Sequence, residues 1–98
     1  SEWVHVGTEE TYVGLNADSA PAGERAPGHR GYGVNHIGFV VGDAEAVYQR
    51  LSAAGYKEGF QPGEPPHRRR VYFLDSDGNE VEFVEYYSDD PAQRNSYD

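Results

Sequence analysis

A turn between two strand-forming runs constrains the fold of this chain most. The segment Asp75–Asn79 separates the runs 67–74 and 80–86, and Gly78 is its fourth residue. Glycine tolerates the positive φ of a tight turn, and Asp and Asn side chains bond the local backbone. The pattern predicts a β-hairpin. A calcium-binding EF-hand loop is excluded, because its glycine is the sixth residue.

A helix is predicted upstream of this hairpin, over about residues 44–54. Asp43 is suited to the N-cap position, where its carboxylate accepts a hydrogen bond from the first turn. Val47 and Leu51 recur at the spacing of one helix face. Gly55 follows where a helix that ends in a left-handed residue needs a glycine.

Two further strands are predicted on either side of the helix, at residues 34–41 and 57–60. Glycine and proline then break the chain over residues 61–66. From residue 34 to residue 86 the order is strand, helix, strand, strand, strand. This order predicts an α+β fold with a mixed sheet.

A second hairpin is predicted near the start of the chain, from residues 3–6 and 11–15. The segment after it is rich in glycine and proline, which is typical of a linker. Residues 88–91 supply a capping residue and a proline suited to the first turn of a short helix. We expect four parts: a hairpin at 1–16, a linker at 17–33, a βαβββ module at 34–87 and a tail at 88–98.

The composition argues against several classes of partner. A formal net charge of −9 disfavours nucleic acid and anionic membranes, since both attract a positive surface. The absence of cysteine excludes disulfides and thiolate metal ligands. No apolar run has transmembrane length, and a cytoplasmic location is the default expectation. Because the chain lacks methionine and begins with strand-forming residues, we expect an N-terminally truncated protein.

Two side chains that can bind metal are predicted to share one face of the sheet. Side chains alternate along a strand, which places His36 and Glu82 on the concave face, opposite the helix. An imidazole nitrogen and a carboxylate oxygen suit Zn²⁺, Fe²⁺, Mn²⁺, Co²⁺ or Ni²⁺ in a site with open positions. A simple His–Glu ion pair explains the same spacing, so both interpretations stay open. The opposite face is expected to pack on Val47 and Leu51 through its apolar residues, which are Ile37, Phe39, Val41, Val81 and Phe83.

The segments Asn35–Phe39 and Asp75–Phe83 together resemble one βαβββ module of the vicinal oxygen chelate superfamily. This superfamily includes glyoxalase I, extradiol dioxygenases and bleomycin-resistance proteins. The resemblance covers residues 34–86 well. It covers residues 2–16 more weakly, as the last hairpin of an incomplete first module. It implies a curved mixed sheet and a cavity between paired modules.

The resemblance also implies a divalent metal ion, held by the first and last strands of each module. His36 and Glu82 match those positions in the second module. In glyoxalase-like members the metal-bound carboxylate also moves a proton, which implies a catalytic role for Glu82. The remaining ligands would come from the first module, whose first strand this chain lacks.

Four further residues are candidates for substrate binding. Trp3, His5 and Tyr12 share one face of the first hairpin, where His5 is an alternative ligand and cavity lining is the simpler role. Arg70 belongs to the cluster 68–70, which either holds a carboxylate or phosphate of the substrate or balances acids across the strand pair. Those acids are Glu80 and Glu85.

Two functions therefore fit the sequence. The first is a divalent-metal-dependent enzyme acting on a small molecule with vicinal oxygens, by lyase, dioxygenase or isomerase chemistry. The second is a metal-free small-molecule-binding protein similar to the bleomycin-resistance proteins. In the second case the groove would have aromatic walls, formed by Trp3, Tyr12, Tyr72 and Tyr86.

The other face of the first hairpin predicts self-association. It carries Val4, Val6, Val13 and Leu15. The helix of a complete first module would cover them, and we expect the truncated chain to lack that helix. An isolated hairpin with an uncovered apolar face is marginal in water. We therefore expect a homodimer.

Overall fold

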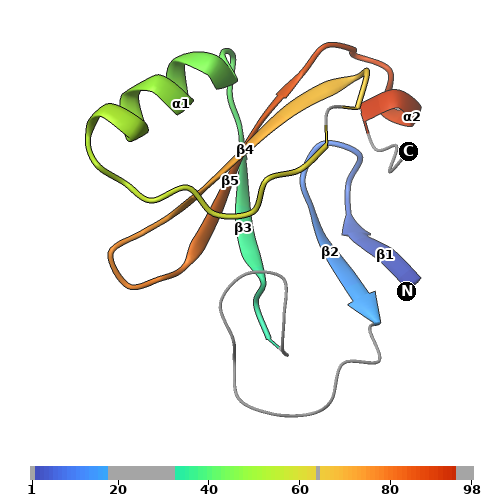
Figure 1. The fold of residues 1–98 in the computed structure, drawn as a ribbon. Helices are drawn as coiled ribbons and strands as arrows, with labels where there is room; N and C mark the ends of the chain where they lie inside the picture. Colours follow the sequence, from blue (N-terminus) through green and yellow to red (C-terminus); the bar gives the residue numbers. More distant parts are fainter. Residues whose placement is uncertain (1, 18–32, 64, 95–98) are drawn as a thin grey trace.

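The protein forms two separate β-sheets and one main helix (Figure 1). A computed structural model describes residues 2–17, 33–63 and 65–94. The linker predicted before residue 33 lies almost wholly outside the described residues. Within them, no helix is long and apolar enough to cross a membrane.

The elements are β1 (Glu2–Gly7), β2 (Tyr12–Ala17), β3 (His36–Val40), α1 (Ala44–Ala53), β4 (Arg68–Leu74), β5 (Glu80–Tyr86) and α2 (Pro91–Arg94).

The larger sheet has the strand order β3-β5-β4. β5 runs parallel to β3 and antiparallel to β4, so the predicted α+β fold with a mixed sheet is confirmed. The turn between β4 and β5 also forms as predicted. Asp75 accepts hydrogen bonds from the backbone N–H groups of Asp77 and Asn79, and Gly78 has a φ of 82°.

The ends of α1 follow the local sequence signals. Asp43 caps the N-terminus by accepting a hydrogen bond from Ala46 N at 3.0 Å. At the other end Gly55 adopts a φ of 89°, and the N–H of Tyr56 bonds back to the carbonyl of Leu51. This pattern of a left-handed glycine with a returning hydrogen bond is a Schellman motif, which satisfies the last carbonyls of the helix.

The strand predicted at residues 57–60 is reduced to a single bridge. Glu58 pairs with Phe73 on the outer side of β4, with hydrogen bonds on either side of the bridge. The pairing stops there because the N–H of Phe60 bonds to the Glu80 carboxylate at 2.9 Å. Prolines follow from Pro62 onward and disfavour further pairing.

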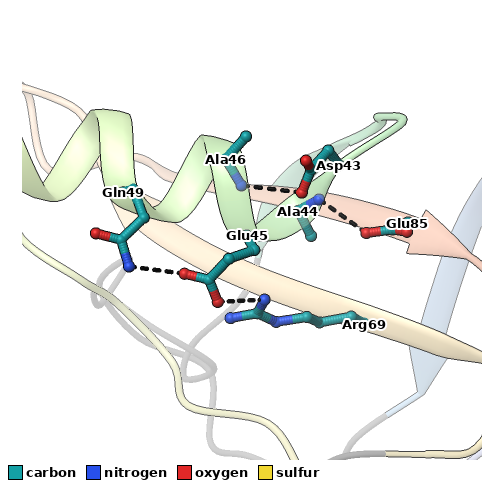
Figure 2. Close-up of polar contacts among 7 residues, drawn as sticks. All are labelled: Asp43, Ala44, Glu45, Ala46, Gln49, Arg69 and Glu85. Carbon is teal, nitrogen blue, oxygen red and sulfur yellow. Dashed lines mark hydrogen bonds and ion pairs between the residues drawn. The ribbon is translucent and has the colours of Figure 1, made fainter.

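One face of the larger sheet packs against α1 (Figure 2). The Tyr48 ring lies 5.8 Å from the Phe73 ring, and Glu45 accepts a hydrogen bond from Arg69 at 2.6 Å. The first N–H of the helix, at Ala44, donates to Glu85 at 2.9 Å. Arg69 and Glu85 stand opposite each other in the register of β4 with β5, and both also contact the helix.

The predicted packing of β3 against α1 is wrong. Ile37 and Phe39 lie on the expected face, since Phe39 stacks with Phe83, but both are more than half exposed. The reason is the position of α1, which contacts β4 and β5 and leaves the edge strand β3 uncovered.

β1 and β2 form the smaller sheet, an antiparallel hairpin that has no strand pairing with the larger sheet among the described residues. Its register places Trp3, His5 and Tyr12 on one face, as predicted. The four aliphatic side chains of the other face are each more than half exposed: Val4, Val6, Val13 and Leu15.

Candidate functional site

His36 and Glu82 lie side by side on the sheet face opposite α1. The register of β3 with β5 pairs Glu82 with Gly38, two residues beyond His36 on the same face. The imidazole Nε2 lies 3.1 Å from the carboxylate Oε1. The His36 side chain is 24 % exposed and the Glu82 side chain 15 % exposed. The structure thus brings together the two residues that the sequence proposed as metal ligands.

Gly38 makes the space for the Glu82 carboxylate. A Cβ atom at position 38 would stand 3.0 Å from Glu82 Oε1, closer than ordinary van der Waals contact. Its backbone has no positive φ, so the need for glycine here is steric rather than conformational. A glycine inside a strand often marks such a close approach. A glycine inside the strand-forming run was therefore the sequence signal for Gly38, to which the sequence alone assigned no role.

Asn35 fixes the orientation of the His36 ring. The Nδ1 atom of His36 lies 2.7 Å from the Oδ1 atom of Asn35. An amide oxygen only accepts hydrogen bonds, so Nδ1 carries a proton. In a neutral ring the lone pair of Nε2 then faces the anionic Oε1 of Glu82. Two lone pairs facing each other require a cation between them, either a proton on Nε2 or a metal ion.

Tyr72 completes the cluster from β4, where it stands directly opposite Glu82 in the register. Tyr72 is only 3 % exposed. The centroid of its ring lies 5.3 Å from that of His36 and 5.4 Å from that of Phe60, both in T-shaped arrangements. Its hydroxyl donates a hydrogen bond to Glu82. Burial, together with the charge of Glu82, raises the pKa of the phenol far above its usual value. Tyr72 therefore remains a hydrogen-bond donor at neutral pH.

Glu82 stays ionised in this environment. Burial acts to raise its pKa, but the hydrogen bond and charge of His36 act in the opposite direction. The Tyr72 hydroxyl and the positive charge of Arg70 lower it further, and the net pKa lies below the ordinary value. A carboxylate that is largely buried yet anionic can bind a cation or accept a proton.

The family assignment agrees with this geometry. The family model described as the Glyoxalase/Bleomycin resistance protein/Dioxygenase superfamily matches residues 2–83. The chain belongs to this superfamily. The match spans the β1–β2 hairpin, α1 and the larger sheet up to the middle of β5. A search of curated proteins finds no match. Binding of small molecules is typical of the superfamily.

Superfamily membership does not specify whether this chain binds a metal ion, so the geometry of His36 and Glu82 has to be compared with that of a metal site. Two ligands that each lie about 2.0–2.2 Å from one zinc ion, at right or tetrahedral angles, are about 2.8–3.6 Å apart. The His36–Glu82 separation of 3.1 Å falls in this range. It is equally a hydrogen-bond distance. The described residues contain no group of three or more His, Cys, Asp or Glu that could hold a metal ion, so the pair is at most part of a site.

The remaining candidates divide between the two sheets. Trp3, His5 and Tyr12 lie on the β1–β2 hairpin, where the His5 and Tyr12 rings stack at 3.9 Å. They share no sheet with His36. Arg70, in contrast, lies on β4 beside Tyr72 and on the same face as Glu82, since it pairs with Val84. Of the four residues proposed to bind substrate, Arg70 is the one that shares a sheet with the His36–Glu82 pair.

A cavity of about 820 Å³ opens along the outer edge of β4. Its walls include Tyr48 of α1, the proline-containing segment around Pro62, and Tyr87 beyond β5. Arg69 and Arg70 both reach it, one from each face of β4. The size is that of a small-molecule pocket. His36 and Glu82 do not line it.

Proposed function

We propose that the protein is a divalent-metal-dependent enzyme acting on a small molecule with two neighbouring oxygens. His36 and Glu82 would be two of the ligands, and Glu82 would also move the proton. The observation that supports this most is the contact of Nε2 with Oε1 at 3.1 Å, with Nδ1 held by Asn35. That arrangement places two electron-pair donors together where a cation must balance them.

The donor set fits Zn²⁺, Fe²⁺, Mn²⁺, Co²⁺ or Ni²⁺, which accept nitrogen and oxygen ligands in sites with open positions. Such an ion, when bound, supplies a Lewis acid that stabilises negative charge developing on a substrate oxygen. Two protein ligands leave positions for the neighbouring substrate oxygens and for ligands from a partner module. Lyase, dioxygenase and isomerase reactions all use this kind of stabilisation.

The chain's own residues would orient the His36 ring and the Glu82 carboxylate, and Glu82 would exchange a proton with the substrate. Asn35 holds the His36 ring, and the space above Gly38 holds the Glu82 carboxylate. Tyr72 donates to Glu82 and is buried, which keeps water away from one side of the carboxylate. A carboxylate held in this way would act as a general base that takes a carbon-bound proton from the substrate.

Isothermal titration with Zn²⁺ tests this proposal. Wild-type protein should bind zinc, while His36→Ala and Glu82→Gln should each weaken binding by about 10-fold to 100-fold or more, since a ligand is lost. His67→Ala and Glu45→Gln are matched controls, because they change the same residue types away from the pair. Equal zinc affinity in His36→Ala and His67→Ala would contradict the proposal.

The alternative is a metal-free protein that binds a small molecule, as the bleomycin-resistance proteins do. The distance of 3.1 Å also suits a hydrogen bond from a protonated His36 to Glu82, and this supports the alternative. The two proposals separate on one measurement. Wild-type protein that binds no zinc, manganese, iron, cobalt or nickel after loading would favour the binding protein.

A further inference from the structure

Arg70 is the cationic side chain of β4 that stands beside the His36–Glu82 pair. The antiparallel register places its neighbours Tyr72 and Glu82 directly opposite each other, with Arg70 one pair further along the same face. Its charge lies close enough to affect both of them. Arg70 therefore faces the same space that a substrate of this site would occupy.

The guanidinium of Arg70 has donor capacity that the described residues do not use. Its Nε atom is buried and has no hydrogen-bond partner among them. A buried N–H without an acceptor is uncommon in folded proteins, because burial costs the group its hydrogen bond to water. An acceptor supplied by a ligand removes that cost.

The cavity along β4 gives a ligand access to Arg70. Arg70 forms part of its wall, and so do the carboxylates Glu45 and Glu58. Glu45 is already held by Arg69 at 2.6 Å and by Gln49 at 2.7 Å. Residues of the cavity wall thus lie on both faces of β4, with Arg69 on the α1 side and Arg70 on the side of Glu82.

The charge distribution favours an anion at this place. The chain has 8 Lys and Arg residues against 17 Asp and Glu, and Arg68, Arg69 and Arg70 are consecutive. They place three of these cationic side chains on the edge strand β4, where Arg69 is already paired with Glu45. The planar fork of a guanidinium matches the two oxygens of a carboxylate with two parallel hydrogen bonds.

We propose that the substrate of this site carries a carboxylate in addition to its two neighbouring oxygens, and that Arg70 binds this carboxylate. The proposal rests on the function proposed above for His36 and Glu82. Arg70 would act as a specificity-determining residue: it orients the substrate from one side while the vicinal oxygens meet the His36–Glu82 pair.

A matched pair of probes tests the proposal: 3,4-dihydroxybenzoate and its methyl ester, which have the same vicinal oxygens and differ in the carboxylate charge. Isothermal titration should show that wild-type protein binds the acid about 10-fold or more tightly than the ester, as expected for a charge-assisted pair. Arg70→Gln should reduce this ratio to about one, and Arg70→Lys should leave an intermediate ratio, because lysine keeps the charge without the fork.

Arg50→Gln is the control, since it removes the same charge from an exposed position of α1 and should leave the ratio unchanged. Circular dichroism of each variant checks that it is folded. Equal binding of acid and ester by wild-type protein, failure to bind the acid, or an unchanged ratio in Arg70→Gln would overturn the proposal. The titrations are run with and without zinc. A preference for the acid without any zinc binding would therefore reject the metal proposal and keep the role of Arg70.

Discussion

The two sheets differ in how they bury their own surfaces. The larger sheet has α1 across one face, and the buried apolar residues belong to it and to the helix: Ala44, Val71, Tyr72, Phe73 and Val84. In the β1–β2 hairpin, every side chain whose exposure is described is at least partly exposed. The larger sheet has a core because α1 covers one of its faces, and the hairpin, which has no such helix among the described residues, has none.

The same difference separates the two groups of candidate site residues. His36 and Glu82 have fixed positions, because Asn35, Gly38 and Tyr72 contact them from neighbouring strand positions. Trp3, His5 and Tyr12 stand on an exposed hairpin, where the His5 ring stacks on the Tyr12 ring. Precise chemistry requires held side chains, so the larger sheet is the better place for a catalytic centre.

The largest expected difference between the two sheets is the loss of unfolding free energy when an apolar residue is replaced by alanine. Phe73→Ala removes a ring that is 3 % exposed and packs on Tyr48, and it should cost about 3–5 kcal/mol of unfolding free energy. At a dilution where the protein is monomeric, Val13→Ala on the hairpin should change that free energy by less than about 0.5 kcal/mol, as exposed substitutions usually do. Urea denaturation measures both, and similar losses in the two variants would contradict the comparison.

Self-association should depend on the hairpin. Each aliphatic side chain buried at an interface contributes about 1.5–3 kcal/mol, so the double variant Val6→Lys with Val13→Lys should weaken a homodimer by at least about 10-fold. Sedimentation equilibrium measures the effect. Ile37→Lys, on the uncovered face of β3, locates the interface: a larger loss there than on the hairpin would move the interface to the other sheet. A folded wild-type monomer at micromolar concentration would contradict the dimer.

The smallest expected effect is the pH dependence of Glu82. Its pKa in the folded protein lies below the ordinary value of 4.5, so its ionised form stabilises the fold. That contribution is complete above about pH 4.5 and is lost as the pH falls through the lower, folded pKa. Glu82→Gln should therefore lose less stability than wild type on acidification. The unfolding free energy of both proteins is measured against pH in the presence of a metal chelator. If the two curves run parallel, the pKa of Glu82 is not shifted and the prediction is wrong.

Local signals were enough to predict much of the fold. Asp43 and Gly55 mark the ends of α1, and the Asp75–Asn79 turn sets the β4–β5 hairpin, because each acts through hydrogen bonds within a few residues. Strand alternation then put His36 and Glu82 on one face. The register decided the rest of the cluster, since Gly38 and Tyr72 both pair with Glu82 from different strands.

What the sequence by itself determined is therefore the order of elements, the caps and turns, and the face on which each strand residue lies. The tertiary structure decided which residues meet across strands. It shortened the strand at 57–60, because the distant Glu80 carboxylate takes the N–H of Phe60. It also left Ile37 and Phe39 exposed, because α1 packs on β4 and β5 instead of β3. Local hydrogen bonds depend on neighbours in the chain, whereas these contacts depend on how whole elements pack.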